Sequence, residues 1–159
     1  MAEKLVLNIV TLCGSARTDS YNAALIRALP NLSSGVLDFK SGPSVADIPI
    51  YDGDLERTSG LPSAVVSLVG AIREADGVLI ATPEHNYSIP GGLKNLLDWV
   101  SRAPNQPFAK KPVLIQSVSA GPMGKEGPLL TAPRLVRLKP SKFPHHDRAW
   151  PGPLHAVCA

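Results

Sequence analysis

The feature that most constrains this chain is a short apolar run that ends in a polar loop. Residues 5–12 read LVLNIVTL, a composition typical of a strand buried on both faces of a parallel sheet. Gly14 breaks the run, and residues 21–29 then have helical spacing. The loop between them is rich in donor side chains, which are Ser15, Arg17, Thr18, Ser20 and Asn22. This order predicts an anion site, because free N–H groups and roughly half a positive charge gather at a helix N-terminus.

The spacing of the loop excludes two common nucleotide motifs and leaves two other readings open. There is no G-x-x-x-x-G-K-[ST] run, and a single glycine cannot supply the three-glycine dinucleotide fingerprint. A terminal monophosphate, gripped by the forked donors of Arg17, therefore suits the loop better than a pyrophosphate. Cys13 could instead begin the C-x5-R loop of a cysteine phosphatase, although Asp19 stands where that arginine is required. Ser20 could also serve only as the N-cap of the helix.

Composition favours one globular domain and disfavours several functions. A chain of 159 residues is long enough for a core, and a net charge of +3 without a basic cluster before the tail argues against nucleic acid. Two cysteines, Cys13 and Cys158, indicate no disulfide framework, and we expect a cytoplasmic protein without a signal peptide or membrane span. We expect no metal site, because the cluster at residues 145–147 reads as an exposed polar turn.

The rest of the chain alternates strands and helices. Further apolar segments predict strands at residues 36–39, 78–81 and 112–118 and helices at residues 62–75 and 91–100. Residues 40–60 are expected to be a packed connection. The alternation predicts a parallel sheet covered by helices on both faces. Three polar loops follow strands of this sheet and should meet at its carboxyl edge, where ligands bind; we call residues 14–22 the first loop, 83–91 the second and 119–127 the third.

Two motifs give this chain a family resemblance. The pattern G-S-x-R-x-x-S-x-N is matched from Gly14 to Asn22, and P-E-Y-N-x-S-x-P-G-x-L-K-N-x-x-D-W is matched from Pro83 to Trp99 with His85 in place of the tyrosine. From about residue 5 to residue 124 the sequence resembles the NADPH-dependent FMN reductase family, in its quinone and chromate reductase branch. The resemblance implies an α/β, flavodoxin-like, doubly wound parallel sheet in three layers.

The resemblance also implies a function. It implies FMN as the cofactor, NADPH or NADH as the electron donor, and quinones as acceptors, with chromate, nitro or azo compounds as further ones. It implies a dimer or tetramer and no catalytic side chain, since the flavin carries the chemistry. From charge and composition we expect no nucleic-acid or membrane partner. The first loop would hold the phosphate and the second the ring, whose packing and potential His85 could alter. The implied cofactor-binding residues are Ser15, Ala16, Arg17, Ser20, Tyr21, Asn22, Pro83, Glu84, His85, Asn86, Tyr87, Ser119 and Gly121.

Four further residues receive structural interpretations. We expect Trp99 to lie in the core or an interface, Lys94 to pair with Asp98 four residues later, and Cys13 to be a buried thiol at a strand end.

The tail does not follow the resemblance. We divide the chain into a flavodoxin-like domain at residues 1–127 and an irregular, proline-rich tail at residues 128–159, which contains six prolines. The family's last strand and helices cannot be read there, so the strand at residues 112–118 is expected to be an unpaired edge. We hypothesise a shifted coding frame near residues 125–128, or an alternative terminal segment; a helix and a strand encoded in another frame would support the first idea. A non-catalytic, flavin-binding remnant is therefore an alternative function.

Overall fold

The fold is built on one five-stranded sheet. The computed structural model describes residues 6–118 and the backbone of residues 134–137. The strand order is β2-β1-β3-β4-β5, with β1 to β4 parallel and β5 antiparallel to β4. The strands are β1 (Leu7–Cys13), β2 (Leu37–Ser41), β3 (Gly77–Ala81), β4 (Pro112–Gln116) and β5 (Arg134–Arg137). The expected parallel sheet is therefore confirmed for its first four strands.

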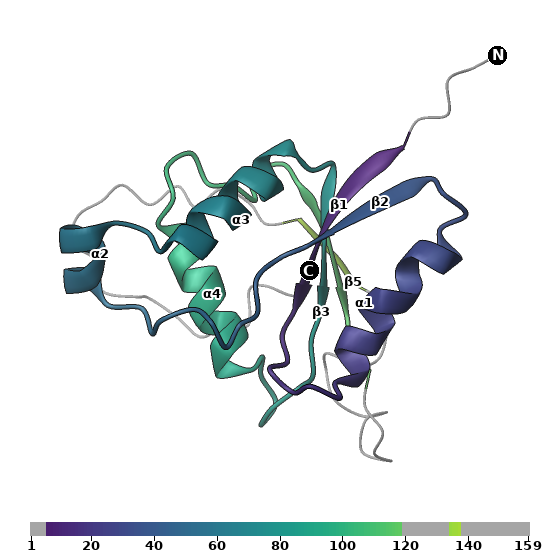
Figure 1. The fold of residues 1–159 in the computed structure, drawn as a ribbon, viewed down its shortest axis with the longest axis horizontal. Coiled ribbons are helices and arrows are strands. Elements are labelled where there is room, and N and C mark those ends of the chain that lie inside the picture. The colour runs from purple at the N-terminus through teal and green to yellow at the C-terminus, as the bar shows by residue number, and fades with distance from the viewer. Residues whose placement is uncertain (1–5, 119–133, 138–159) are drawn as a thin grey trace.

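Helices lie on both faces of the sheet. The described helices are α1 (Tyr21–Leu32), α2 (Gly53–Ser59), α3 (Ser63–Glu74) and α4 (Gly91–Ser101). Figure 1 shows α1 on one face, α3 and α4 on the other, and α2 farther out beside α4. The α1 helix continues three residues beyond the expected end at Leu29, through Pro30. No helix in the described part of the chain is long and apolar enough to cross a membrane.

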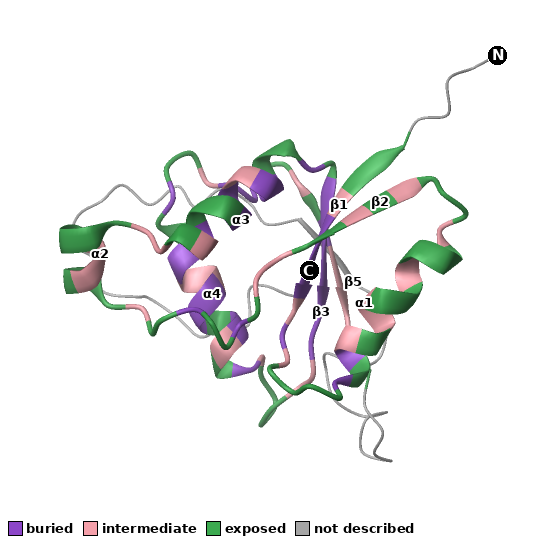
Figure 2. Ribbon diagram, in the orientation of Figure 1, coloured by how far each residue is buried: buried purple, intermediate pink, exposed green. Residues whose placement is uncertain are grey.

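The core is concentrated on the α3 and α4 side. Val10 and Leu12 of β1 pack there with Ile72, Leu96 and Trp99, all at most 2% exposed. On α1, by contrast, Leu25, Ile26 and Leu29 are only half-buried, and Figure 2 shows that helix mostly in pink and green. Full burial of a large apolar side chain contributes about 1.5–3 kcal/mol, so the α3 and α4 layer supplies most of the hydrophobic stabilisation among the described residues.

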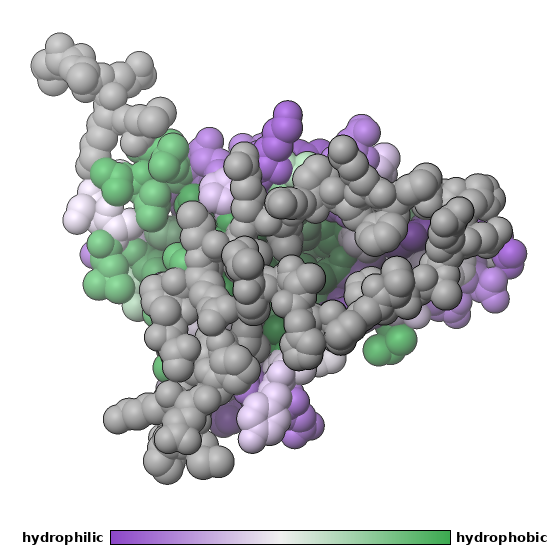
Figure 3. All heavy atoms as spheres, turned by 180° about the vertical axis from the view of Figure 1, so that it is seen from behind, coloured by the Kyte–Doolittle hydropathy of each residue, from purple (hydrophilic) through white to green (hydrophobic). Residues whose placement is uncertain are grey.

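The expectation that β1 is buried on both faces is wrong for its first half. Leu7 and Asn8 are exposed, and only Val10, Thr11 and Leu12 are fully buried. The reason is register: β1 pairs with β3 only from Ile9 onward, so its first residues have a neighbour strand on one side alone. Apolar side chains consequently gather near the amino-terminal end in Figure 3, and the exposed ones there are Val6, Leu7, Leu32 and Val36.

The connection at residues 40–60 is packed, as expected, but it also contains a helix. Val45 and Ile48 are buried in the core. The unexpected α2 helix buries none of its residues, so it has no apolar periodicity to reveal it. The sequence features that mark this helix are the residues that cap its two ends. The Asp52 carboxylate accepts from the Asp54 N–H at 2.8 Å, and Gly60 ends the helix with φ 72°.

The expected unpaired edge at β4 is also wrong. Residues 134–137, which lie within the expected irregular tail, form β5 and pair antiparallel with β4. Unpaired N–H and C=O groups on an apolar edge strand readily recruit another segment, and β5 supplies one from the same chain. The division at residue 127 thus does not separate two independent parts of the sheet.

Candidate functional site

The first loop leaves β1 in close contact with the end of β3. The Gly14 N–H donates to the Ala81 carbonyl at 2.8 Å, which extends the pairing of the two strands past Cys13. A Cβ on Gly14 would lie 2.2 Å from Thr82 Oγ1 and 2.6 Å from Thr82 Cβ. Only glycine fits this contact, so the first loop and the end of β3 are held together at the carboxyl edge of the sheet.

The start of α1 is capped and still offers donors. Ser20 is the N-cap, and its Oγ accepts from the Ala23 N–H at 3.3 Å, so the capping interpretation is confirmed. Within residues 6–118, no acceptor pairs with the N–H groups of Tyr21 and Asn22 or with the Ser20 hydroxyl hydrogen. Helix starts leave such N–H groups free, so the cap and an anion site are compatible.

The first loop also carries an uncommitted positive charge. Arg17 is exposed, and its backbone N–H donates to Ser15 Oγ at 3.3 Å. Its guanidinium forms no ion pair or hydrogen bond with any described residue. Ser15 is half-buried and Ala16 is exposed. Toward the described residues, the loop therefore presents one unpaired guanidinium beside the unpaired N–H groups of the helix.

The second loop is a tight turn at the end of β3. His85 and Ser88 exchange two backbone hydrogen bonds, of 2.8 Å and 3.0 Å. Asn86 and Tyr87 between them have φ values of 51° and 60°, the left-handed pattern of a type I′ turn. This conformation is unfavourable for a tyrosine by about 1–2 kcal/mol. The Tyr87 side chain is nevertheless 82% exposed, so burial of its ring does not compensate for that cost.

Glu84 contains an unsatisfied acceptor. Pro83 and Glu84 are half-buried, and Glu84 Oε2 is shielded from solvent without a hydrogen-bond partner among the described residues. A shielded acceptor without a partner is costly by about 1–3 kcal/mol or more when it is charged. A ligand N–H at the second loop would satisfy this oxygen.

The structure brings the first two loops together, and the third lies outside the described residues. Both loops follow neighbouring strands, β1 and β3, at one edge of the sheet. Val118, just after β4, reaches the same edge and bonds to Asn22. The expected site residues Ser119 and Gly121 lie outside the described residues. Eleven of the expected site residues thus occur at this edge, while the two of the third loop are not described.

Several motif residues have structural roles. Trp99 is fully buried, as expected, and its indole N–H donates to the Pro49 carbonyl at 2.8 Å. Asn95 holds the same connection, accepting from the Tyr51 N–H at 2.7 Å. Lys94 pairs with Asp98, which confirms that expectation. Cys13 lies at the end of β1, half-buried rather than buried, with its thiol 3.5 Å from the Ser15 carbonyl oxygen.

Sequence reasoning missed Thr82 as part of the site. This residue is 1% exposed and fixes the separation of the first two loops through its contact with Gly14. A glycine directly after a buried strand is the one signal of such a close approach.

A polar network stabilises α2 and α4 away from the loops. The Tyr51 hydroxyl donates to Glu56 at 2.8 Å, and Arg102 Nε donates to both oxygens of the same carboxylate. The hydrogen bond from Tyr51 lowers the pKa of Glu56, and Arg102 lowers it further. The same hydrogen bond raises the pKa of Tyr51. The network joins helices and does not contribute to the site.

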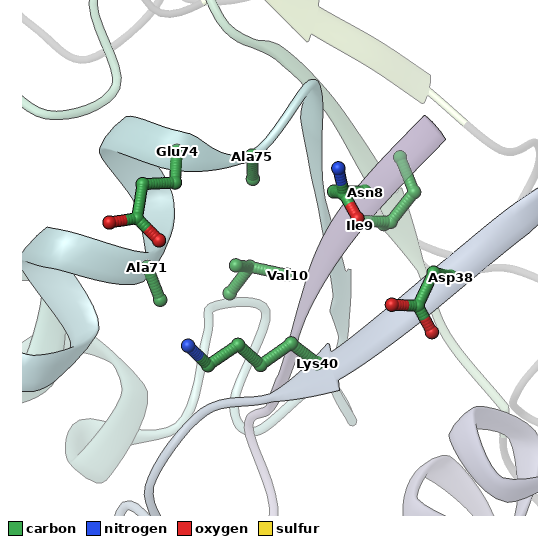
Figure 4. Close-up of a pocket in the computed structure, with 8 residues that line it drawn as sticks. All are labelled: Asn8, Ile9, Val10, Asp38, Lys40, Ala71, Glu74 and Ala75. Atoms are coloured by element: carbon green, nitrogen blue, oxygen red, sulfur yellow. The ribbon is translucent and has the colours of Figure 1, made fainter. Parts of the chain in front are cut away.

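A cavity of about 250 Å³ lies apart from the loops, between β1, β2 and the last turn of α3. In Figure 4, Lys40 and Glu74 extend along it from opposite sides. The β1 residues that line it, from Asn8 to Val10, lie toward the amino-terminal end of that strand and away from the loops, so the cavity is not part of the candidate site. Its lining residues are Asn8, Ile9, Val10, Asp38, Lys40, Ala71, Glu74 and Ala75. Within the described residues, no group of three or more side chains could hold a metal ion.

A family model described as NADPH-dependent FMN reductase matches residues 7–131, which include both motif loops. This chain belongs to the NADPH-dependent FMN reductase family. It is 52% identical over 124 residues to a quinone reductase of Escherichia coli K12, an alignment that covers 78% of this chain and 65% of the relative. It is 40% identical over 123 residues to an NAD(P)H-dependent FMN reductase of Pseudomonas aeruginosa, an alignment that covers 74% of this chain and 63% of that relative.

A solved structure supports the same membership. The flavoenzyme NAD(P)H:(acceptor) oxidoreductase FerB of Paracoccus denitrificans superimposes with a TM-score of 0.67 at 36% identity, covering 75% of this chain and 64% of FerB. The expected flavodoxin-like fold is thereby confirmed. This member of the FMN reductase family spans slightly less than two thirds of the length of these relatives.

Proposed function

We propose that this chain binds FMN at the carboxyl edge of its sheet and acts as an NAD(P)H-dependent oxidoreductase of quinones. The observation that supports it most is the pairing of two loops on neighbouring strands. Among the described residues, the N–H groups and the Arg17 guanidinium of the first loop and one Glu84 oxygen of the second have no partner. Membership of a family described as NADPH-dependent FMN reductase supplies the chemical class.

The first loop suits the FMN phosphate. The N–H groups of Tyr21 and Asn22 and the hydroxyl of Ser20 can donate to phosphate oxygens, and Arg17 can add a charge-assisted pair. Ser15 and Ala16 are small enough for close approach. Asp19 is the one acidic residue of this loop, and its carboxylate is exposed to solvent, where screening weakens repulsion.

The second loop suits the ring. Glu84 Oε2 can accept from the N–H on the pyrimidine edge of an isoalloxazine ring. His85, Asn86 and Tyr87 would line the ring through a turn that is rigid because both its ends are hydrogen-bonded. We propose that Ser119 and Gly121 close the other side. Bound FMN would supply the redox chemistry, accepting hydride from NAD(P)H at N5, and no side chain is proposed as a catalytic acid or base.

The finer aspects of this function are also proposals. Quinones are the proposed acceptors because a relative at 52% identity is named a quinone reductase. Chromate, nitro and azo compounds are further candidates, and so is self-association as a dimer or tetramer. The low cysteine content suits a reducing, cytoplasmic location.

Flavin binding by the purified full chain tests the proposal. FMN should bind more tightly than riboflavin, which lacks the phosphate. Arg17→Ala should weaken FMN binding about tenfold, since hydrogen bonds to charged groups are worth about 1.5–3 kcal/mol, reduced here by solvent exposure. Riboflavin binding should not change. Arg27→Ala, which removes an exposed arginine one helical turn beyond the loop, is the matched control. Equal affinity for the two flavins would refute the phosphate site.

Turnover separates this function from two alternatives. A reductase should oxidise NADPH when FMN and a benzoquinone are present, faster than free FMN does. FMN binding without this turnover would favour a non-catalytic flavin-binding protein. Cleavage of an aryl phosphate that is lost in Cys13→Ser would favour the phosphatase reading instead.

A further inference from the structure

Asn22 makes two hydrogen bonds to a residue 96 positions away. Its Nδ2 donates to the Val118 carbonyl at 3.2 Å, and its Oδ1 accepts from the Val118 N–H at 3.0 Å. The residue is 3% exposed. The side-chain amide thus pairs with one residue's main chain as a neighbouring strand would, with one donor and one acceptor satisfied on each side.

The hydrogen-bonded pair of Asn22 and Val118 links two sides of the candidate site. Asn22 lies in the first turn of α1, and Val118 lies two residues beyond β4. In the sheet, β3 lies between β1 and β4. The pair therefore joins the first loop to the far side of the second loop, across the carboxyl end of β3.

We infer that Asn22 is a positioning residue, whose side chain holds the end of β4 against the start of α1 and sets the width of the site. This inference rests on the proposed flavin function. It assigns the Asn22 side chain to the ring side of the site, through Val118, rather than to the phosphate. The backbone N–H of Asn22 remains available to an anion, because both hydrogen bonds use side-chain atoms.

The exposure of Val118 separates a role in positioning the strand end from a role in stabilising the whole fold. Val118 is 36% exposed, so water can satisfy its N–H and C=O when the amide is removed. The fold is then retained, whereas the fixed separation between α1 and the end of β4 is lost. An aspartate would keep the acceptor for the Val118 N–H but would lack the donor and would repel the carbonyl oxygen.

Flavin affinities of Asn22→Ala test this assignment. FMN and riboflavin should both bind about tenfold more weakly and by the same factor, because the end of β4 is no longer held in place and the phosphate contacts are unchanged. The visible absorption of bound flavin should also shift, because the surroundings of the ring change. Asn22→Asp should weaken both flavins at least as much.

Two control variants make the result specific. Arg17→Ala should weaken FMN alone. Lys111→Met removes a lysine that donates to the Arg73 carbonyl at 2.9 Å, before the opposite end of β4, and should lower the melting temperature without changing either affinity. If Asn22→Ala weakens FMN but not riboflavin, the side chain contacts the phosphate and the inference is overturned. Unchanged affinity for both flavins would overturn it as well.

Hydrogen exchange separates this inference from the proposed function. The Val118 N–H should be protected in the unliganded wild-type chain and should exchange faster in Asn22→Ala. Equal exchange in the two proteins would show that the pair does not hold the strand end. Should the wild-type chain bind neither flavin, the proposed function fails, and the exchange at Val118 still decides whether Asn22 fixes the end of β4.

Discussion

Replacing Gly14 with alanine should separate the two loops on which the site depends. The added methyl group would lie 2.2 Å from Thr82 Oγ1, 2.6 Å from Thr82 Cβ and 3.1 Å from Leu93 Cδ2. Real Cβ atoms essentially never come as close as the two Thr82 distances, so atoms must move. Thr82 is buried and β-branched, which leaves it few rotamers, and its N–H is bonded to Gln116 of β4 at 2.9 Å.

The expected loss in the free energy of unfolding follows from overpacking of a buried contact. Extra methyl groups in well-packed sites cost about 1–3 kcal/mol, and the stiffness of Thr82 places this one at about 2–3 kcal/mol. For a chain of this size, that loss lowers the melting temperature by about 5–10 °C. FMN affinity should fall as well, because the first loop must move away from the end of β3.

A thermal melt followed by circular dichroism measures the effect. Gly70→Ala is the matched control, since nothing lies within 4 Å of its added Cβ in α3. This variant should stabilise the chain by about 0.5–1 kcal/mol, as glycine is a poor helix former. Replacing Thr82 with glycine in the Gly14→Ala background should recover part of the loss. A Gly14→Ala melting temperature within 1–2 °C of wild type would refute the close contact.

Two further predictions concern the hydrogen bonds that hold the connection at residues 40–60 against α4 and its C-terminal cap. Asn95→Ala removes the acceptor of the Tyr51 N–H and the donor to the Pro49 carbonyl at 2.9 Å, and should cost about 2–3 kcal/mol in urea unfolding; an unchanged midpoint would contradict it. The hydrogen bond from Tyr51 lowers the pKa of Glu56 below its ordinary 4.5, so the unfolded chain takes up the proton first. The stability that Glu56 contributes is therefore complete above pH 4.5 and is lost as the pH falls through the lower folded pKa. Glu56→Gln should flatten the fall in melting temperature across that acidic range, and identical acid profiles would contradict the network.

Much of the fold could be predicted from local patterns. Buried strands such as β3 are continuous apolar runs, and α4 repeats Leu93, Leu96 and Val100 on one face, so periodicity identified both. The two motif loops were likewise visible, because their residue types lie next to one another in the sequence. The α2 helix was missed since it buries no residue and therefore has no apolar stripe. The pairing of β5 with β4 was missed because a four-residue strand carries too little periodicity to recognise.

The sequence by itself determined the class of fold, the places of the first four strands along the chain and the two loops that carry the donors. These properties follow from composition and spacing along neighbouring residues. Only the tertiary structure decided that Gly14 must be glycine, that Asn22 pairs with Val118, and that one Glu84 oxygen has no partner within the described part of the chain. Each of these facts depends on distances between segments far apart in the chain, which are fixed when the strands pack side by side and not before.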